Sequence, residues 1–252
     1  MKKKVCKKCG SQMAGKFCEN CGGKAKGNTG LIVGLIILAF IIIGVLNPKD
    51  EETITANGNN DNEGEAADLS NIDKVYELTS GYYTAKIDLP EGKCNITVIS
   101  GKGNVSSSNM YSGGLNEMMG VGDPELYATE FNGLKMDDEV TLSVSNGVKI
   151  RLEYTSITNG YIGRQYDDSK AIELSNGNYV AGTDFPAGIY NIIAVLGNGN
   201  VSTSNLFSGG INAMMGVSGG EFYETEYKNV NLAKTVELTI SNGVTVRLVP
   251  EK

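Results

Sequence analysis

The sequence predicts a mainly β protein, in which two tandem β-sandwich domains of jelly-roll-like form follow a four-cysteine zinc ribbon and one transmembrane helix. Three observations predict this fold class. Residues 77–152 recur at 173–248 without a gap, residues 30–46 form an uncharged apolar run, and two Cys-x-x-Cys pairs stand near the N-terminus. The expected segments are a zinc ribbon at 1–28, a transmembrane helix at 29–47, a disordered acidic linker at 48–70, β-domain copy one at 71–154, a connector at 155–170 and β-domain copy two at 171–252.

Four of the five cysteines form the predicted metal site, and they are Cys6, Cys9, Cys18 and Cys21. Each Cys-x-x-Cys pair places two thiolates on one side of a tight turn. Four thiolates close a tetrahedral shell around Zn²⁺ and leave no open position, which makes the site structural. A redox site of the thioredoxin type would use one such pair inside an α/β domain, which the sequence does not suggest. Few apolar residues surround the cysteines, so zinc binding would supply the folding energy, on the order of 10 kcal/mol.

The apolar run of residues 30–46 predicts a membrane anchor. As a helix it spans roughly 25 Å at ~1.5 Å per residue, near the lower limit for crossing a bilayer. A buried core helix and a cleaved signal peptide are the alternatives. A signal peptide has a short basic start before ~7–15 apolar residues, whereas here 29 residues with a metal motif come first. An uncleaved helix is therefore expected.

Charge is divided unevenly along the chain. Residues 1–29 hold eight lysines and one glutamate, a net charge of +7, and the whole chain is −7, so the remainder carries −14. The positive-inside rule then predicts a cell-membrane protein with a cytoplasmic N-terminus and extracytoplasmic C-terminal domains. The acidic part would repel phosphates, which argues against nucleic acid as its partner. A nucleic-acid or protein contact through the basic ribbon remains an alternative.

The repeat predicts two copies of one β-domain. About half of the aligned positions are identical, and Ser145-Asn146-Gly147-Val148 matches Ser241-Asn242-Gly243-Val244. Residues 236–240 and 244–248 alternate with period two around Asn242-Gly243, a strong hairpin signal because both positions accept positive φ. Short strands with turns every ~8–12 residues favour a sandwich or jelly roll.

One short segment in each copy suggests a helical turn, Leu115–Met119 and its mate Ile211–Met215. Leu115, Met118 and Met119 fall at the helical spacing i, i+3, i+4. We expect these turns to close one end of each sandwich. The alternative is an exposed, adaptable methionine surface that binds a ligand.

No catalytic or cofactor-binding residue is predicted, and we expect no enzyme. The chain has no histidine, which removes the commonest general base and excludes any Ser-His or Cys-His nucleophile. Carboxylate chemistry by residues such as Glu130 and Glu226 is left open, although solvated strand faces explain them more simply. Cys94 stands alone, and a packed strand residue is favoured over a redox sensor or an intermolecular disulfide.

The N-terminal layout resembles a known group. Cys6-x-x-Cys9-Gly10, Phe17-Cys18-x-x-Cys21-Gly22 and one apolar span are similar to zinc-ribbon single-pass membrane proteins of Gram-positive bacteria, such as the teicoplanin-resistance-associated zinc-ribbon proteins. The repeats resemble an uncharacterised bacterial surface module, whose signature here is Gly177-x-Tyr179…Asp184-x-Pro186-x-Gly188-x-Tyr190. Copy one has Cys94 in place of the last tyrosine. The resemblance implies no activity.

These observations predict a membrane-anchored cell-envelope protein with a cytosolic structural zinc ribbon. Outside, the β-domains would bind a wall polymer, a peptide or a partner protein. The alternatives are a structural or assembly role without a small ligand, and a nucleic-acid or protein contact through the ribbon.

Overall fold

The computed structural model describes residues 4–5, 12–13, 69–219 and 223–252, and the chain divides into two compact units, Met1–Asn62 and Glu63–Lys252. In the first unit, strands β1 (Lys4–Val5) and β2 (Gln12–Met13) pair antiparallel. The four predicted zinc ligands, the apolar run 30–46 and residues 48–68 of the linker lie outside the described residues. Where the structure is described, it contains no helix long and apolar enough to cross a membrane.

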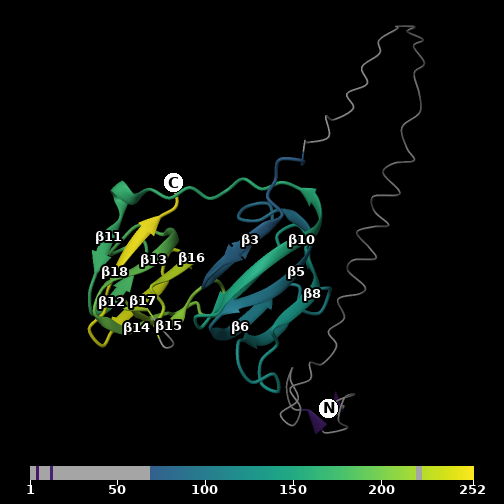
Figure 1. The fold of residues 1–252 in the computed structure, drawn as a ribbon. Coiled ribbons are helices and arrows are strands. Elements are labelled where there is room, and N and C mark those ends of the chain that lie inside the picture. Colours follow the sequence, from purple (N-terminus) through teal and green to yellow (C-terminus); the bar gives the residue numbers. More distant parts are fainter. Residues whose placement is uncertain (1–3, 6–11, 14–68, 220–222) are drawn as a thin grey trace, which may run out of the picture. The chain divides into compact units, whose positions relative to one another are not determined.

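Copy one is built from eight strands in two four-stranded sheets (Figure 1). The strands are β3 (Val75–Leu78), β4 (Gly81–Thr84), β5 (Glu91–Ser100), β6 (Lys102–Ser107), β7 (Asn116–Gly120), β8 (Glu130–Met136), β9 (Thr141–Ser145) and β10 (Lys149–Asn159). One sheet has the order β3-β10-β5-β8 and the other β4-β9-β6-β7, with antiparallel neighbours throughout. Counted within the copy, these orders are 1-8-3-6 and 2-7-4-5, the strand order of a jelly roll.

Copy two repeats this arrangement. Its strands are β11 (Ile172–Leu174), β12 (Gly177–Val180), β13 (Gly188–Leu196), β14 (Asn198–Thr203), β15 (Asn212–Gly216), β16 (Glu226–Leu232), β17 (Glu237–Ser241) and β18 (Thr245–Pro250). They pair in the orders β11-β18-β13-β16 and β12-β17-β14-β15. Six strands begin 96 residues after their counterparts and two begin 97 residues after them. A short 3-10 helix, η1 (Asp168–Lys170), lies between the copies in sequence.

Each copy has its own hydrophobic core, drawn from both of its sheets. Period-two burial explains why these segments are strands. Leu142 and Val144 of β9 are fully buried, whereas Thr141 and Ser143, which alternate with them, are half-buried on the opposite face. The Asn-Gly turns behave as predicted, because Asn242 (φ 63°) and Gly243 (φ 92°) both have positive φ. The mainly β prediction is confirmed.

The expected helical turns are wrong, because both segments are strands. Met119 and Met215 are fully buried, whereas Met118 is 51% and Met214 43% exposed, so neighbouring side chains lie on opposite faces, as in a strand. Burial alternates with period two over residues 212–215 of β15, whereas residues 116–118 of β7 are all exposed. Strands β7 and β15 pair with β6 and β14 along their whole length, so the sheet supplies the hydrogen bonds of their backbone. Five residues with i, i+3, i+4 spacing are too few to distinguish a helical turn from such a strand.

Candidate functional site

The two copies meet at unlike sheet edges. Strand β16 of copy two pairs parallel with β4 of copy one at Lys228 and Gly81, which continues both sheets into one of eight strands. The Lys228 amide donates to the Ser80 carbonyl at 3.0 Å. A Cβ placed on Gly81 would lie 2.8 Å from the Lys228 Cβ and 2.9 Å from its carbonyl oxygen. Glycine at position 81 is what lets the two strands approach.

Side chains of β4 and β16 hold this junction. The Tyr82 hydroxyl donates to the Gly210 carbonyl, and the Tyr82 ring packs 5.8 Å from the ring of Tyr227. In return, the Asn229 amide donates to the Tyr82 carbonyl. Asn229 is buried, so its amide depends on these protein partners.

A partly buried carboxylate forms a further contact across the junction. Glu224 of copy two accepts a hydrogen bond at Oε1 from the Asn146 amide of copy one, at 3.0 Å. Its Oε2 atom is buried, and a side-chain interaction with Ser80 of copy one only partly offsets that burial. Burial therefore raises the pKa of the Glu224 carboxyl above its ordinary value.

An arginine closes one end of the junction. Arg164, whose side chain is only 13% exposed, pairs with Asp88 of copy one and with Glu251 of copy two, at 2.8 Å in each case. Asp88 also accepts a bond from the Asn229 amide. Despite Arg164, burial raises the pKa of Asp88. The Arg164 charge is thus already balanced inside the protein.

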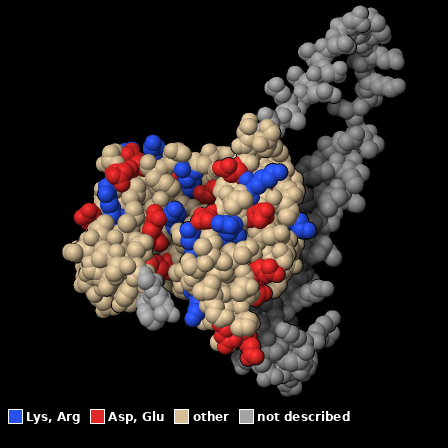
Figure 2. Space-filling model, in the orientation of Figure 1, with Lys and Arg blue, Asp and Glu red and all other residues tan. Residues whose placement is uncertain are grey.

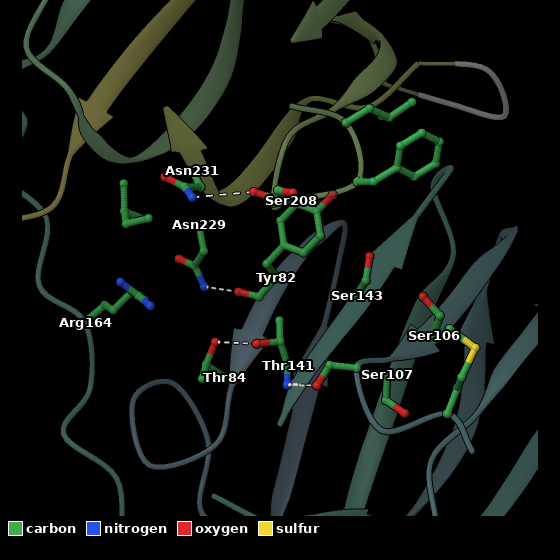
Figure 3. A pocket seen from close by; sticks show the side chains of 16 residues that line it. Tyr82, Thr84, Ser106, Ser107, Thr141, Ser143, Arg164, Ser208, Asn229 and Asn231 are labelled. Carbon is green, nitrogen blue, oxygen red and sulfur yellow. Dashed lines mark hydrogen bonds between the residues drawn. The ribbon is translucent and has the colours of Figure 1, made fainter. Parts of the chain in front are cut away.

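A cleft of about 570 Å³ opens beside the junction (Figure 3). Its floor is the outer face of β4, β9 and β6 in copy one. Its opposite wall comes from copy two, through the loop Leu206–Gly209 and Asn229 and Asn231 of β16. The side chains on the floor share a hydroxyl group, and they are Tyr82, Thr84, Ser106, Ser107, Ser108, Thr141 and Ser143.

Local hydrogen bonds fix several of these hydroxyls. The Thr84 and Thr141 hydroxyls bond to each other at 3.0 Å across neighbouring strands. Ser108 Oγ accepts from the Thr141 amide, and Ser107 Oγ accepts from the Leu115 amide. A hydroxyl that accepts in this way keeps its proton available as a donor. Ser107 is buried, whereas Thr84, Ser108 and Thr141 are less buried, so these three are fixed groups that can still bond to a ligand.

The cleft is polar but nearly uncharged. Among the residues that line it, Arg164 carries the one formal charge, which its two carboxylates balance. The equivalent outer face of copy two is similar in character, with Asn178, Ser202 and Thr239 at the positions of Tyr82, Ser106 and Ser143. In Figure 2 few charged side chains appear at the lower left, over β12, β14 and β17.

A highly exposed aromatic side chain lies at the rim of the cleft. Phe207, in the loop of copy two, is 98% exposed. Tyr111 is its counterpart in copy one and is 97% exposed, but it does not line the cleft. Phe207 and Tyr111 are thus almost equally exposed, but Phe207 lies at the cleft and Tyr111 does not.

The residues singled out from the sequence lie elsewhere. Cys94 is fully buried in β5, is not in a disulfide, and has its pKa raised to about 12 by burial, as for a packed strand residue. Glu130 and Glu226 lie at equivalent positions in β8 and β16 of different copies. No group of three or more Cys, Asp or Glu that could hold a metal ion occurs within the described part of the chain. The sequence did not predict the cleft. The alternation Thr141-x-Ser143 does indicate a polar strand face, and that face is part of the cleft floor.

Comparison with known proteins adds little to this description. No family model and no curated protein matches the chain. Among solved structures it is similar to a cupin 2 conserved barrel domain protein from Leptotrichia buccalis, at 13% identity and a TM-score of 0.21 over 71% of this chain and 82% of that one. A conserved protein of unknown function from Pseudomonas aeruginosa PAO1 matches at 9% identity and a TM-score of 0.20, over 71% and 80% of the two chains. Scores this low carry no argument about function.

Proposed function

We propose that this chain is a membrane-anchored cell-envelope protein that binds an extracytoplasmic ligand in the cleft between its two β-domains. The observation that carries the proposal is the cleft itself, which both copies are needed to form. Ligand sites are typically concave and occur often at domain interfaces. The apolar run at 30–46 and the lysine-rich segment before it support anchoring with the copies outside.

In this proposal the N-terminal segment is a structural zinc ribbon on the cytoplasmic side. Cys6, Cys9, Cys18 and Cys21 would hold Zn²⁺, and the ion would supply the energy that folds the segment. Pairing of β1 with β2 supports a hairpin here, because Cys6 and Cys9 lie between these strands in sequence. The ligands themselves lie outside the described residues.

The proposed role is binding without catalysis. A serine nucleophile needs an adjacent base, and the residues that line the cleft include no carboxylate and no free amine. The hydroxyl groups serve instead as hydrogen-bonding partners. A purely structural role in the envelope is the competing function, and blocking the cleft separates the two.

The test blocks the cleft in the full-length chain. Ser106→Trp places a large side chain on the cleft floor, and Ser202→Trp adds the same bulk at the equivalent position of copy two. Detergent-solubilised protein is passed over immobilised cell-envelope fragments. We expect retention by the native chain and by Ser202→Trp, and loss of retention by Ser106→Trp. Equal retention of all three chains would contradict ligand binding in the cleft and favour the structural role.

A further inference from the structure

We propose that the ligand of the inter-copy cleft is an uncharged sugar chain. This inference rests on the proposed binding function and names the chemistry of its ligand. Three properties of the cleft carry it: the array of hydroxyl groups, the absence of an available charge, and the exposed aromatic ring at the rim.

The hydroxyl array matches a ligand that is itself rich in hydroxyls. Thr141 and Ser143 lie two residues apart on β9, with Thr84 and Ser106 on the strands at either side. Sheet geometry spaces such groups ~4.8 Å across strands and roughly 6.7 Å along one strand. Each hydroxyl both donates and accepts, as the hydroxyls of a sugar ring do. A ligand with several hydroxyls on one face can therefore bond to several strands at once.

The charge of the site excludes strongly ionic ligands. Arg164 already pairs with Asp88 and Glu251, so an anion would have to compete with two carboxylates for it. A cation would find no carboxylate among the residues that line the cleft. Burying an unpaired charge costs far more than burying a hydrogen-bonded hydroxyl. The site therefore favours a neutral polar ligand.

Phe207 supplies the apolar part of the site. Its side chain is 98% exposed and lines the cleft together with Leu206 and Met110. A pyranose ring has C–H groups on its faces and hydroxyls at its edge, so it can pack on an aromatic ring while bonding to the floor. Covering an exposed Phe with apolar surface is favourable by roughly 25 cal/mol per Å².

A peptide fits the cleft less well. Extended peptides commonly bind by adding a strand to an open sheet edge. The cleft floor is a sheet face, whose main chain is already paired in the ladders of β4 with β9 and of β6 with β9. In the described part of copy one, the edge strands of the sheets are β3, β7 and β8, and none of them lines the cleft.

The test titrates the full-length chain in detergent with uncharged hexasaccharides of glucose, mannose, galactose and N-acetylglucosamine. The deacetylated form of the last one is a matched cationic control. At least one uncharged hexasaccharide should bind, and the cationic one should not. Phe207→Ala should weaken binding roughly tenfold, and Ser106→Trp should abolish it. Tyr111→Ala and Ser202→Trp are the matched controls and should leave the affinity unchanged.

The outcomes separate this inference from the proposed function. If no uncharged hexasaccharide binds, but retention on envelope fragments still depends on Ser106, the sugar assignment is wrong and the binding cleft stands. Cleft-dependent capture of a peptide from these fragments would likewise overturn the sugar assignment. If Ser106→Trp changes neither measurement, both proposals fail.

Discussion

The two copies share a scaffold and differ at the residues that join them. Tyr82 of β4 bonds across the junction, and Asn178 stands at its place in copy two. On the other side, copy two has Glu224, Tyr227 and Asn229, where copy one has Ala128, Phe131 and Gly133. The side chains that hold the junction are therefore found only at the two edges that meet, and the equivalent edges that stay open lack them.

What both copies keep is the main-chain geometry. Gly177 is retained at the open β12 edge, and Asn176 Oδ1 accepts from the Gly243 amide as Ser80 Oγ accepts from the Gly147 amide. A head-to-tail contact between unlike edges leaves one edge of each kind open, and repetition of that contact between molecules would build a filament. Divergence of the side chains limits the specific contact to one junction within the chain.

The largest effect should come from Gly81→Val, which forces side-chain atoms into Lys228. We expect a loss of about 2–3 kcal/mol from the free energy of unfolding and separation of the two cores into distinct thermal transitions. The matched control is Gly177→Val, where the three atoms nearest to an added Cβ all belong to the side chain of Tyr179. Scanning calorimetry measures both. Equal losses of unfolding free energy from the two variants would show that glycine is needed no more at the junction than at the open edge of copy two.

Asn229→Ala should have the next largest effect. It removes the amide that bonds to the Tyr82 carbonyl and leaves the Tyr166 hydroxyl without its acceptor. Unpaired buried polar groups cost about 1–3 kcal/mol. The reciprocal change Gly133→Asn adds the same side chain to the open β8 edge, at a φ of 80° that asparagine accepts better than most residues, and should cost no more than about 1 kcal/mol. Chemical denaturation of both variants measures these changes. An Asn229→Ala variant with an unchanged free energy of unfolding would show that this contact does not stabilise the junction.

Cys94→Ala should cost about 1 kcal/mol, because it removes one buried sulfur from the core of copy one. Oligomeric state and response to oxidants should not change. Size-exclusion chromatography with and without a reductant measures both properties. A dimer that disappears with this change would show that Cys94 is more than a packed side chain.

The smallest effect is a pH dependence at Glu224. Its folded-state pKa is raised, so its contribution favours the folded state most below the unfolded pKa and is lost as pH rises through the folded pKa. Glu224→Gln keeps the acceptor for Asn146 and removes the charge. It should be more stable than the native chain at pH 7 and close to it at pH 4. Glu226→Gln should leave that slope in place, and identical pH profiles of native and Glu224→Gln chains would contradict the prediction.

Features of the fold that depend on local interactions were predictable from the sequence, and features that depend on contacts between distant segments were not. Turn residues such as Asn242-Gly243 and the period-two burial of β9 are local, so the sequence predicted the β fold and its repeat. The segment around Met118 and Met119 was misread because its strand pairing with β6 is not local. The cleft depends on which sheet edges meet, and no spacing encodes that. The zinc ribbon and the membrane helix stay predictions.

The covalent link between the copies changes what their junction has to achieve. Two domains in one chain experience each other at an effective concentration on the order of mM, and here the connector itself packs against both copies through Arg164. The two sheets join through one bridging pair, Lys228 with Gly81, and through the side-chain bonds described above, and a junction inside one chain need not be strong enough to assemble separate proteins. Within one chain it can stay closed, so the cleft exists at any protein concentration and requires no second subunit.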